Sequence, residues 1–321
     1  MKTSRLLGLA TVLGLLGLCW AALVTVRSPA SSGESDQRIA AVLTQQQTYL
    51  QSITSLQFDA RSVVEYGEAL QAAGVPAARI ENALRFATSG ARFRAESTYG
   101  NPAIPRTKTL TVAFDGEKYQ TLDMLSTTTL SVTRSRAKDK PYPGMHPLVL
   151  IYGWALRPGH EHSLAQLQYG DVWSQLSADV VSCTEVTKTG ISAIENSGIE
   201  LKLTSPPAGS SADQTTYEVI FASEFDYLPV YCKTVLPDGF TLESQVTATE
   251  TVPSNIGPIR IPRRVEWVSR LSDGRLSDAG CLEIDTSTLK VNKPIDDGVF
   301  TIPLSSADRF IDEDIGVTIR Q

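Results

Sequence analysis

Residues 109–116 read TLTVAFDG, in which Leu110, Val112 and Phe114 alternate with smaller or polar side chains. A period of two places successive side chains on opposite sides of a strand. Asp115-Gly116 at the end is a strong hairpin signal, because glycine supplies the positive φ that a tight turn needs. The segment therefore predicts a strand that turns back into an antiparallel neighbour.

The same period of two continues on both sides of this hairpin. It starts near Phe93, returns at Leu130, and recurs in close succession around 199–203, 217–221, 240–246, 265–271 and 281–284. Turn sequences at 237–239 (PDG) and 272–274 (SDG) separate the later segments. Connections this short favour antiparallel neighbours, since parallel pairs need long crossovers.

Three other segments have helical patterns. Apolar residues at helical spacing predict a helix from Asp36 to about residue 54, followed by a strand over 58–66. Residues 76–86 (PAARIENALRF) predict a second helix that Gly90 terminates, and a helical insert is expected near 147–180. The fold class predicted from this order is α+β, a curved antiparallel sheet with helices on one side.

The N-terminus predicts export. Lys2 and Arg5 precede residues 6–26, which contain no charge, and Arg27 closes the run. This is the layout of a secretory signal, and it is also long enough to span a bilayer. A cleaved signal, with a cleavage candidate after Ala30, and a retained membrane anchor both remain open. Lipidation at Cys19 fits less well, because the small residue expected before it is a leucine.

These features divide the chain into three parts. Residues 1–30 are the signal peptide or N-terminal membrane anchor, 31–37 are a linker, and 38–321 form a single β-rich domain. The domain is expected in the periplasm or on the outer side of the inner membrane. Without residues 1–30 the chain has 26 basic and 35 acidic residues. An acidic domain without long basic runs disfavours nucleic acid as a partner.

No catalytic signature or cofactor motif is found, so we predict no enzyme activity and no cofactor. The cluster His160-Glu161-His162 is interpreted as a solvated loop rather than a metal site. The acidic groups at Asp285, 296–297 and 312–314 lack the spacing of a calcium loop. After Cys19, three cysteines remain, and spacing does not decide between a disulfide and free thiols: Cys183, Cys232 and Cys281.

A family resemblance rests on the order of several short segments. An amphipathic helix and a first strand over 40–66 precede FDGEKY at 114–119, YLPV at 227–230, IPRRVEWV at 261–268 and VNKPIDDGVFTIP at 291–303. In this order the chain resembles divergent members of the LolA/LolB-like superfamily of exported lipoprotein carriers. The resemblance implies an unclosed half-barrel whose concave face, covered by helices, holds acyl chains. The insert near 147–180 and the possible anchor depart from that pattern.

Two functions are carried forward. The first is a non-enzymatic, envelope-located protein that binds a lipid or a lipid-modified protein in an apolar half-barrel cavity. The second is a structural or envelope-sensing module, tethered through residues 6–26, whose sheet face is filled by its own side chains. A hydrolase using His160 or His162 is a weaker third hypothesis. The candidate lining of the cavity is the alternating set Leu110, Val112, Leu130, Leu201, Tyr217, Val219, Phe221, Leu242 and Trp267.

Overall fold

The structure is a computed structural model that describes residues 33–74, 79–100, 108–124, 127–135, 180–187, 197–204, 215–254 and 257–320. The chain divides into two compact units, 1–38 and 39–321. Residues 1–30, the loop with His160 and His162, and the predicted insert up to residue 179 lie outside the described residues. Within the described ranges, no helix has both the length and the apolar character needed to cross a bilayer.

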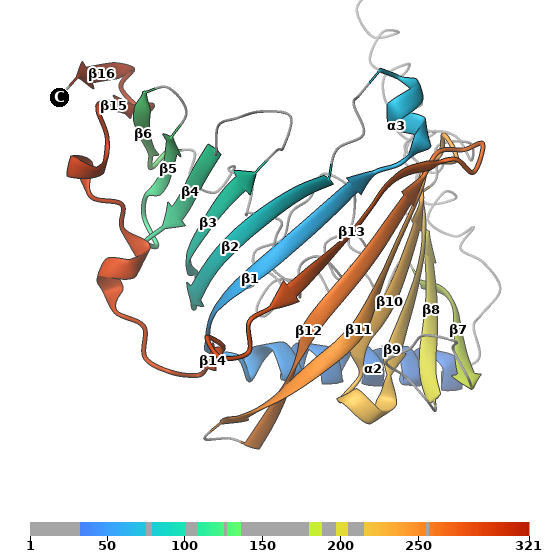
Figure 1. Cartoon of the computed structure of the whole chain (residues 1–321). Coiled ribbons are helices and arrows are strands. Elements are labelled where there is room, and N and C mark those ends of the chain that lie inside the picture. Colours follow the sequence, from blue (N-terminus) through green and yellow to red (C-terminus); the bar gives the residue numbers. More distant parts are fainter. Residues whose placement is uncertain are drawn as a thin grey trace, which may run out of the picture. The chain divides into compact units, whose positions relative to one another are not determined.

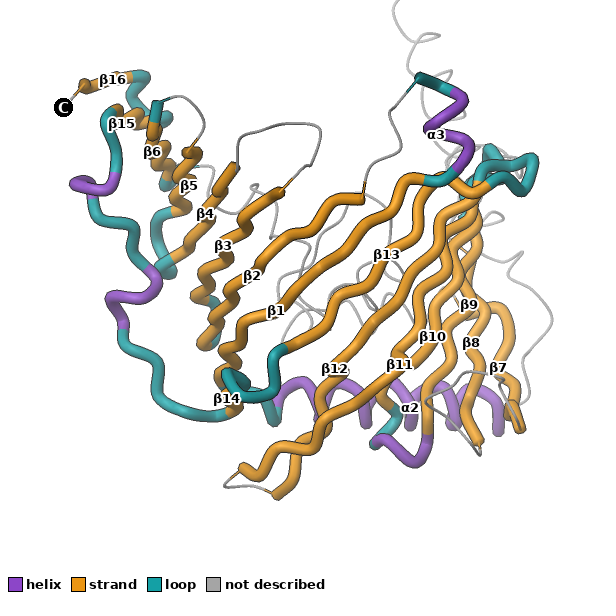
Figure 2. Tube along the Cα trace, in the orientation of Figure 1, coloured by secondary structure: helices purple, strands orange, loops and turns teal. Residues whose placement is uncertain are grey.

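The described strands form one sheet with two open edges (Figures 1 and 2). In chain order they are β1 (Ser55–Tyr66), β2 (Arg79–Ser89), β3 (Arg92–Gly100), β4 (Lys108–Phe114), β5 (Tyr119–Met124), β6 (Thr128–Thr133), β7 (Val180–Thr187), β8 (Ser197–Thr204), β9 (Thr216–Ala222), β10 (Leu228–Val235), β11 (Thr241–Ser254), β12 (Gly257–Arg270), β13 (Leu276–Ile284), β14 (Lys290–Val291), β15 (Arg309–Asp312) and β16 (Val317–Arg320). Their order across the sheet is β16-β15-β6-β5-β4-β3-β2-β1-β13-β12-β11-β10-β9-β8-β7, and β14 pairs with β1.

Two antiparallel meanders, β1–β6 and β7–β13, meet where β1 pairs with β13. The predicted antiparallel sheet is thus confirmed. The hairpin predicted at Asp115-Gly116 joins β4 to β5, with Gly116 at φ 107° and the Asp115 carboxylate accepting hydrogen bonds from the amides of Glu117 and Lys118. One pair is parallel, that of β6 with β15 in the C-terminal segment.

The described helices are few. α2 (Gly33–Gln51) agrees with the first predicted helix, and it begins inside the stretch expected as a linker. α3 (Glu68–Ala72) is short, and three 3-10 turns follow, η3 (Ser223–Phe225), η4 (Asp297–Phe300) and η5 (Leu304–Ser306). Helices covering a concave face, as predicted, are not established by these elements.

The second predicted helix is wrong, since residues 79–89 form strand β2. Ala, Leu, Arg and Glu favour a helix, but the burial of this segment alternates: Leu84 and Phe86 are buried, whereas Ala83 and Arg85 are exposed. β2 pairs along its length with β1 on one side and β3 on the other. Pairing with two neighbours therefore outweighs the intrinsic helix preference.

The register of the strands sorts their side chains onto two faces. Directly opposed residues share a face, so Phe58, Phe86 and Ala95 lie together, and Arg61 and Ala83 lie on the other side. The side that carries Phe58 and Phe86 is called the apolar face below. The side that carries Arg61 is called the charged face.

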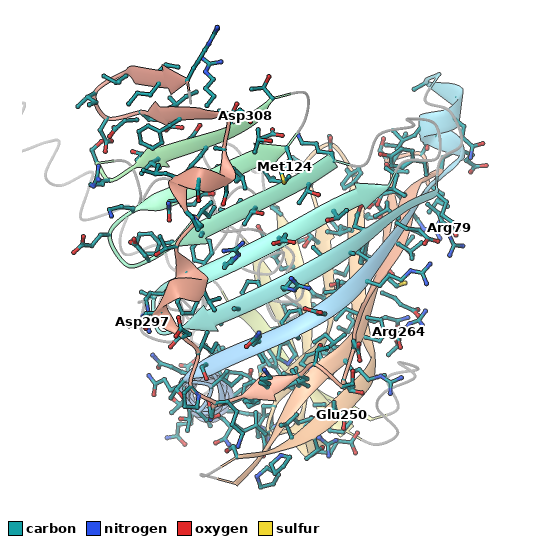
Figure 3. The ribbon with its side chains drawn as sticks, turned by 60° about the vertical axis from the view of Figure 1, so that its left-hand side comes forward. Arg79, Met124, Glu250, Arg264, Asp297 and Asp308 are labelled. Carbon is teal, nitrogen blue, oxygen red and sulfur yellow. The ribbon has the colours of Figure 1, made fainter. Side chains whose placement is uncertain are left out.

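The C-terminal segment, residues 293–320, covers part of the charged face. Ala113, Leu122, Leu130 and Val132 on β4–β6 form a core cluster with Ile302 and Ala307 of this segment. Gln120 holds the segment by two hydrogen bonds, donating to the Ile302 carbonyl and accepting from the Ile302 amide, both at 3.1 Å. Figure 3 shows Asp297 and Asp308 on this segment, which lies across the strands of the first meander.

Candidate functional site: the apolar face of the sheet

Aromatic side chains dominate the apolar face of the first meander. The rings of Phe58 and Phe86 are stacked with centroids 5.4 Å apart. Phe93 lies 6.0 Å from Phe114 and 6.2 Å from Tyr119, the latter edge-on. Each of these residues comes from a different strand between β1 and β5, so the aromatic surface runs across the strands rather than along one of them.

The apolar face continues past the pairing of β1 with β13. Leu282 and Ile284 of β13 belong to the same buried cluster as Phe58, and so do Val219 and Phe221 of β9. The cluster therefore extends over ten neighbouring strands, from β5 to β9. At about 4.8 Å between strands, this is a width of roughly 43 Å.

Most of the predicted lining residues lie on this face. Val112, Tyr217, Val219 and Phe221 are buried members of the cluster, and Leu110 and Trp267 pack against it while partly buried. Leu242 is buried opposite Thr234 and Ser269, on the same side of the sheet. Leu201 is paired with Val219, and its side chain lies outside the described residues.

Leu130 is not brought together with the other predicted residues. It is fully buried on the charged face, beneath the C-terminal segment, with Ile302 and Ala307. The alternation in 128–133 showed that one side of β6 is apolar, but alternation alone does not say which face of the sheet that side joins.

Trp267 lies against a glycine of the next strand. Trp267 on β12 is opposite Gly280 on β13, and a Cβ atom at Gly280 would stand 2.3 Å from Cζ2 of the indole and 2.6 Å from the carbonyl oxygen of Val63. Only glycine therefore allows the indole to lie over β13. Trp267 retains some exposure, which leaves an aromatic surface accessible on this side of the sheet.

Helix α2 is anchored on the apolar face at the end where β1 begins (Figure 1). Ile39, Val42, Leu43, Leu50 and Ile53 belong to the same cluster as the strands, which fixes the apolar side of the helix.

Two hydrogen bonds add to this anchoring of α2. The Tyr49 hydroxyl donates to the carbonyl of Arg260 on β12, and Gln46 donates to the carbonyl of Asp226 at 3.1 Å. Burial, together with the nearby Asp226 carboxylate, raises the pKa of Tyr49, so its hydroxyl stays protonated and remains a donor at neutral pH.

The helix is shorter than the face is wide. A helix of 19 residues is about 28 Å long, against roughly 43 Å for the apolar face. Among the described residues, α2 is the only α-helix in this cluster, which Phe225 of the 3-10 turn η3 also joins. It therefore covers only part of the apolar face.

Polar residues gather on the same face farther from α2. Ser62 and Asn82 are directly opposed and buried, and the buried Ser97 is the diagonal neighbour of Asn82 on β3. On the same face, Lys108 of β4 and Asp123 of β5 form an ion pair of 3.2 Å, with Lys108 opposite Tyr99, the β3 partner of Asn82. This set, Ser62, Asn82, Ser97, Lys108 and Asp123, is called the polar end of the apolar face.

The sequence reasoning missed the polar end. Asn82 stands in the pattern Ile80, Asn82, Leu84, Phe86, where one side of a strand is apolar except at one position. That exception becomes visible only when 79–89 is interpreted as a strand rather than a helix.

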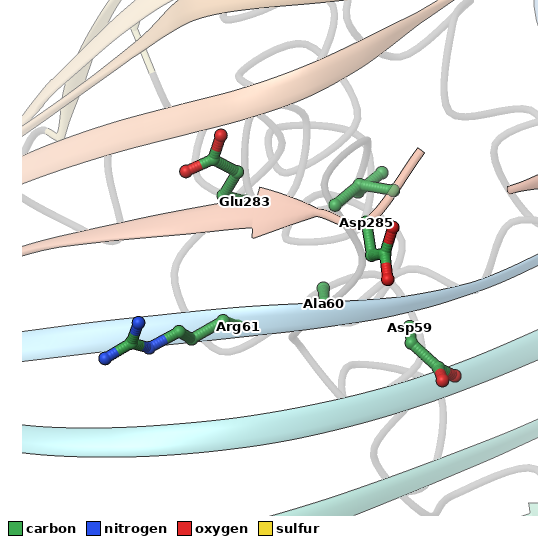
Figure 4. A pocket seen from close by; sticks show the side chains of 6 residues that line it. Asp59, Ala60, Arg61, Glu283 and Asp285 are labelled. Atoms are coloured by element: carbon green, nitrogen blue, oxygen red, sulfur yellow. The ribbon is translucent and has the colours of Figure 1, made fainter. Parts of the chain in front are cut away.

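The charged face carries ion pairs instead of apolar side chains. Arg61 pairs with Glu81, Arg85 with Asp59 at 3.2 Å, and Arg264 with both Glu266 and Glu283. A shallow depression on β1 and β13 (Figure 4) is lined by Asp59, Ala60, Arg61, Glu283, Ile284 and Asp285. Arg61, Asp59 and Glu283 already have partners, and Asp285 accepts hydrogen bonds from Ser287. The depression therefore offers a ligand few free polar groups.

The acidic groups considered for calcium have structural roles where they are described. Asp296 accepts from the Gly298 amide at the start of η4, and Asp314 accepts from Thr133, Arg134 and Ser135 next to β6. Across the described ranges, no group of three or more potential metal ligands is found.

The three cysteines after Cys19 are free thiols. Cys232 is buried on the apolar face opposite Ser244, and burial raises its pKa to about 12, so its thiol is unreactive at neutral pH. Cys183 and Cys281 are partly buried. The alternative of free thiols, left open by the spacing, is the one found in the structure.

Comparison with known proteins gives limited similarity. No family model and no curated protein sequence matches the chain. Solved structures that are similar include a DUF1329 family protein from Desulfovibrio piger, with 9% identity, a TM-score of 0.46, and coverage of 82% of this chain and 97% of that one. LprF from Mycobacterium bovis gives 8% identity, a TM-score of 0.28, and coverage of 82% and 96%. A beta-barrel-like DUF1849 protein from Brucella abortus gives 9% identity, a TM-score of 0.23, and coverage of 75% of this chain and 99% of that one. Similarities at this level establish neither a shared family nor a shared function.

Proposed function

We propose that this protein is an exported, non-enzymatic binding protein that holds an acyl chain, of a lipid or of a lipid-modified protein, against the apolar face of its sheet. The observation that carries the proposal is the mismatch between that face and its described cover. The cluster spans ten strands, whereas the length of α2 is about two-thirds of that width.

Burial of alkyl groups would supply the affinity. Each CH₂ removed from water contributes about 0.8 kcal/mol, so a chain of a dozen or more carbons needs few polar contacts for tight binding. Leu110, Phe114 and Trp267 are partly exposed members of this face and would meet the chain first, above the buried cluster that contains Phe58 and Phe86. Export rests on the charge pattern of residues 1–30, and a retained segment would tether the same domain to the membrane.

The first experiment is native mass spectrometry of the full-length protein after gentle extraction, followed by solvent extraction of any bound lipid. A co-purified acyl-bearing molecule in stoichiometric amount supports the proposal. A protein of bare mass, which also fails to take up added fatty acid, removes it and leaves the structural or sensing module.

A pair of variants tests where the ligand sits. Ala95 on β3 is buried on the apolar face, whereas Ala83 on β2 is exposed on the charged face. Ala95→Trp should reduce the co-purified ligand several-fold with little change in stability, because the indole occupies space that a ligand would fill. Ala83→Trp, the control, should change neither the amount of co-purified ligand nor the stability.

The alternative function, a module whose sheet face is filled by its own side chains, predicts the opposite result for the stability of Ala95→Trp. If side chains of the chain itself fill the space above Ala95, the larger side chain is overpacked and should cost about 1–3 kcal/mol. Urea unfolding of the two variants measures this difference, and a destabilised Ala95→Trp with unchanged ligand content would contradict the proposal.

A further inference from the structure

Two buried acceptor oxygens at the polar end have no hydrogen-bond donor. Asn82 is 3% exposed, and its Oδ1 has no partner. Asp123 is paired with Lys108 through Oδ2, while its Oδ1 is buried without a hydrogen bond. A buried acceptor left without a donor has lost its hydrogen bonds to water without replacement, so a group that donates to it would be stabilising.

The neighbours of these oxygens could hold a polar group. Ser62 faces Asn82 across the β1–β2 pair, and Ser97 is its diagonal neighbour across β2–β3. Opposed and diagonal side chains of a sheet lie within about 5 and 8 Å of one another. Two hydroxyls and an amide are thus neighbours on a face whose other end, near Phe58 and Phe86, is hydrocarbon, and the ion pair lies on the same face farther along, on β4 and β5.

The type of unpaired atom limits the chemistry of what binds there. Both are acceptors, so the missing group must donate a hydrogen bond. A phosphate diester or a carboxylate at neutral pH has no proton to donate and would add repulsion beside Asp123. Lys108 already balances the Asp123 charge at 3.2 Å, so a cationic group is not required either. An uncharged group with hydroxyl or amide N–H donors fits best.

We propose that the polar end binds the uncharged, hydrogen-bond-donating head group of an acylated ligand, such as the hydroxyls of a glycerol or sugar, while its acyl chain extends over the aromatic residues toward α2. This inference rests on the proposed function and adds to it the head-group class and the orientation of the ligand. Asn82 is its principal determinant, with Ser62 and Ser97 beside it.

The test compares two probes that have the same acyl chain. The full-length protein is titrated with monomyristoylglycerol and with its 3-phosphate, each below its micelle-forming concentration, and binding is followed by calorimetry. The neutral probe should bind about tenfold more tightly or better. Equal affinities, or tighter binding of the phosphate, would overturn the inference and leave the proposed function standing. If neither probe nor free fatty acid binds, both fail.

The Asn82→Leu variant tests the role of this residue. Replacing an unsatisfied buried amide by an apolar side chain of similar size should leave stability unchanged or raised, so the variant is expected to fold. Its affinity for monomyristoylglycerol should fall about five- to tenfold, while affinity for the phosphate probe stays the same. A variant that retains the full preference for the neutral probe would exclude Asn82 as the determinant and contradict the inference.

The matched control is Thr98→Val on the other side of β3. Thr98 lies on the charged face, where its hydroxyl is 3.3 Å from that of Thr109. The substitution removes one hydroxyl at nearly constant volume. It should change the affinity for neither probe, and an effect equal to that of Asn82→Leu would mean that the polar end has no special role.

Discussion

The two faces of strand β1 differ in how they are stabilised. On the apolar face Phe58 is fully buried and stacked on Phe86. On the charged face Arg61 and Glu81 form an ion pair whose side chains stay 63% and 45% exposed. Exposed ion pairs contribute about 0–1 kcal/mol, far less than a buried aromatic side chain. On β1 the larger stabilising contribution therefore comes from the apolar face, and the charged face presents its ion pairs to solvent.

The strongest test of this contrast uses two substitutions on β1. Phe58→Ala should cost about 3–5 kcal/mol because it leaves a cavity in the largest cluster. Arg61→Ala, on the charged face, should cost less than about 1 kcal/mol. Urea unfolding monitored by circular dichroism gives both values. A similar loss of unfolding free energy in the two variants would show that the two faces of β1 contribute equally to stability.

Gly280→Ala tests the packing of Trp267 on the apolar face. The new Cβ would meet both the indole and the carbonyl of Val63, so a cost of about 3 kcal/mol, the upper end for overpacking, is expected. The indole should move, which tryptophan fluorescence detects. Ala279→Ser on the charged side of β13 is the control and should leave the spectrum unchanged. An unaltered emission in Gly280→Ala would place the indole elsewhere.

Gln120→Leu tests the one region where the charged face is covered. The change leaves the Ile302 amide and carbonyl without partners, which should cost about 2 kcal/mol and loosen the C-terminal segment. Hydrogen exchange should increase between residues 297 and 312 and stay constant in β9–β12. An equal increase in exchange in residues 297–312 and in β9–β12 would mean that the segment and the sheet open together.

The smallest effect expected is a pH dependence at Asp314. Hydrogen bonds from the hydroxyls of Ser135 and Thr133 lower the pKa of Asp314 well below its usual range. Its stabilising contribution is therefore complete above the unfolded pKa of about 3.9 and is lost only as pH falls toward the folded value. The protection factors of β15 amides, which are exchange rates corrected for the intrinsic effect of pH, should stay constant from pH 7 to 5 and fall in strong acid. In Asp314→Asn these protection factors should already be lower at pH 7, and a change in the wild-type protection factors near neutral pH would point to another group.

The sequence predicts where strands occur better than it predicts which face of the sheet each side chain lies on. The period of two and the turn at Asp115-Gly116 lead directly to β4 and β5. In 79–89, helix-forming residues concealed the alternation of Asn82, Leu84 and Phe86, because propensity is local whereas pairing with β1 and β3 is not. Leu130 shows the same limit, since its pattern is that of Leu110 but its partner, Ile302, is far away in sequence. The parallel pairing of β15 with β6 has no local signal at all.

The pairing of β1 with β13 also determines when the sheet is completed. Ala60 is opposed to Ile284, whereas within each meander most strands pair with their neighbours in sequence. Each meander can begin to form as soon as its own strands exist, but their union must wait for residues 276–284 and carries the entropy of closing a long loop. Until then β1 is an open edge with aromatic neighbours, the kind of surface on which chains aggregate. The β1–β13 pairing is thus expected to be the slow step of folding, and the interval before it forms is when the newly made chain is most exposed to misassembly.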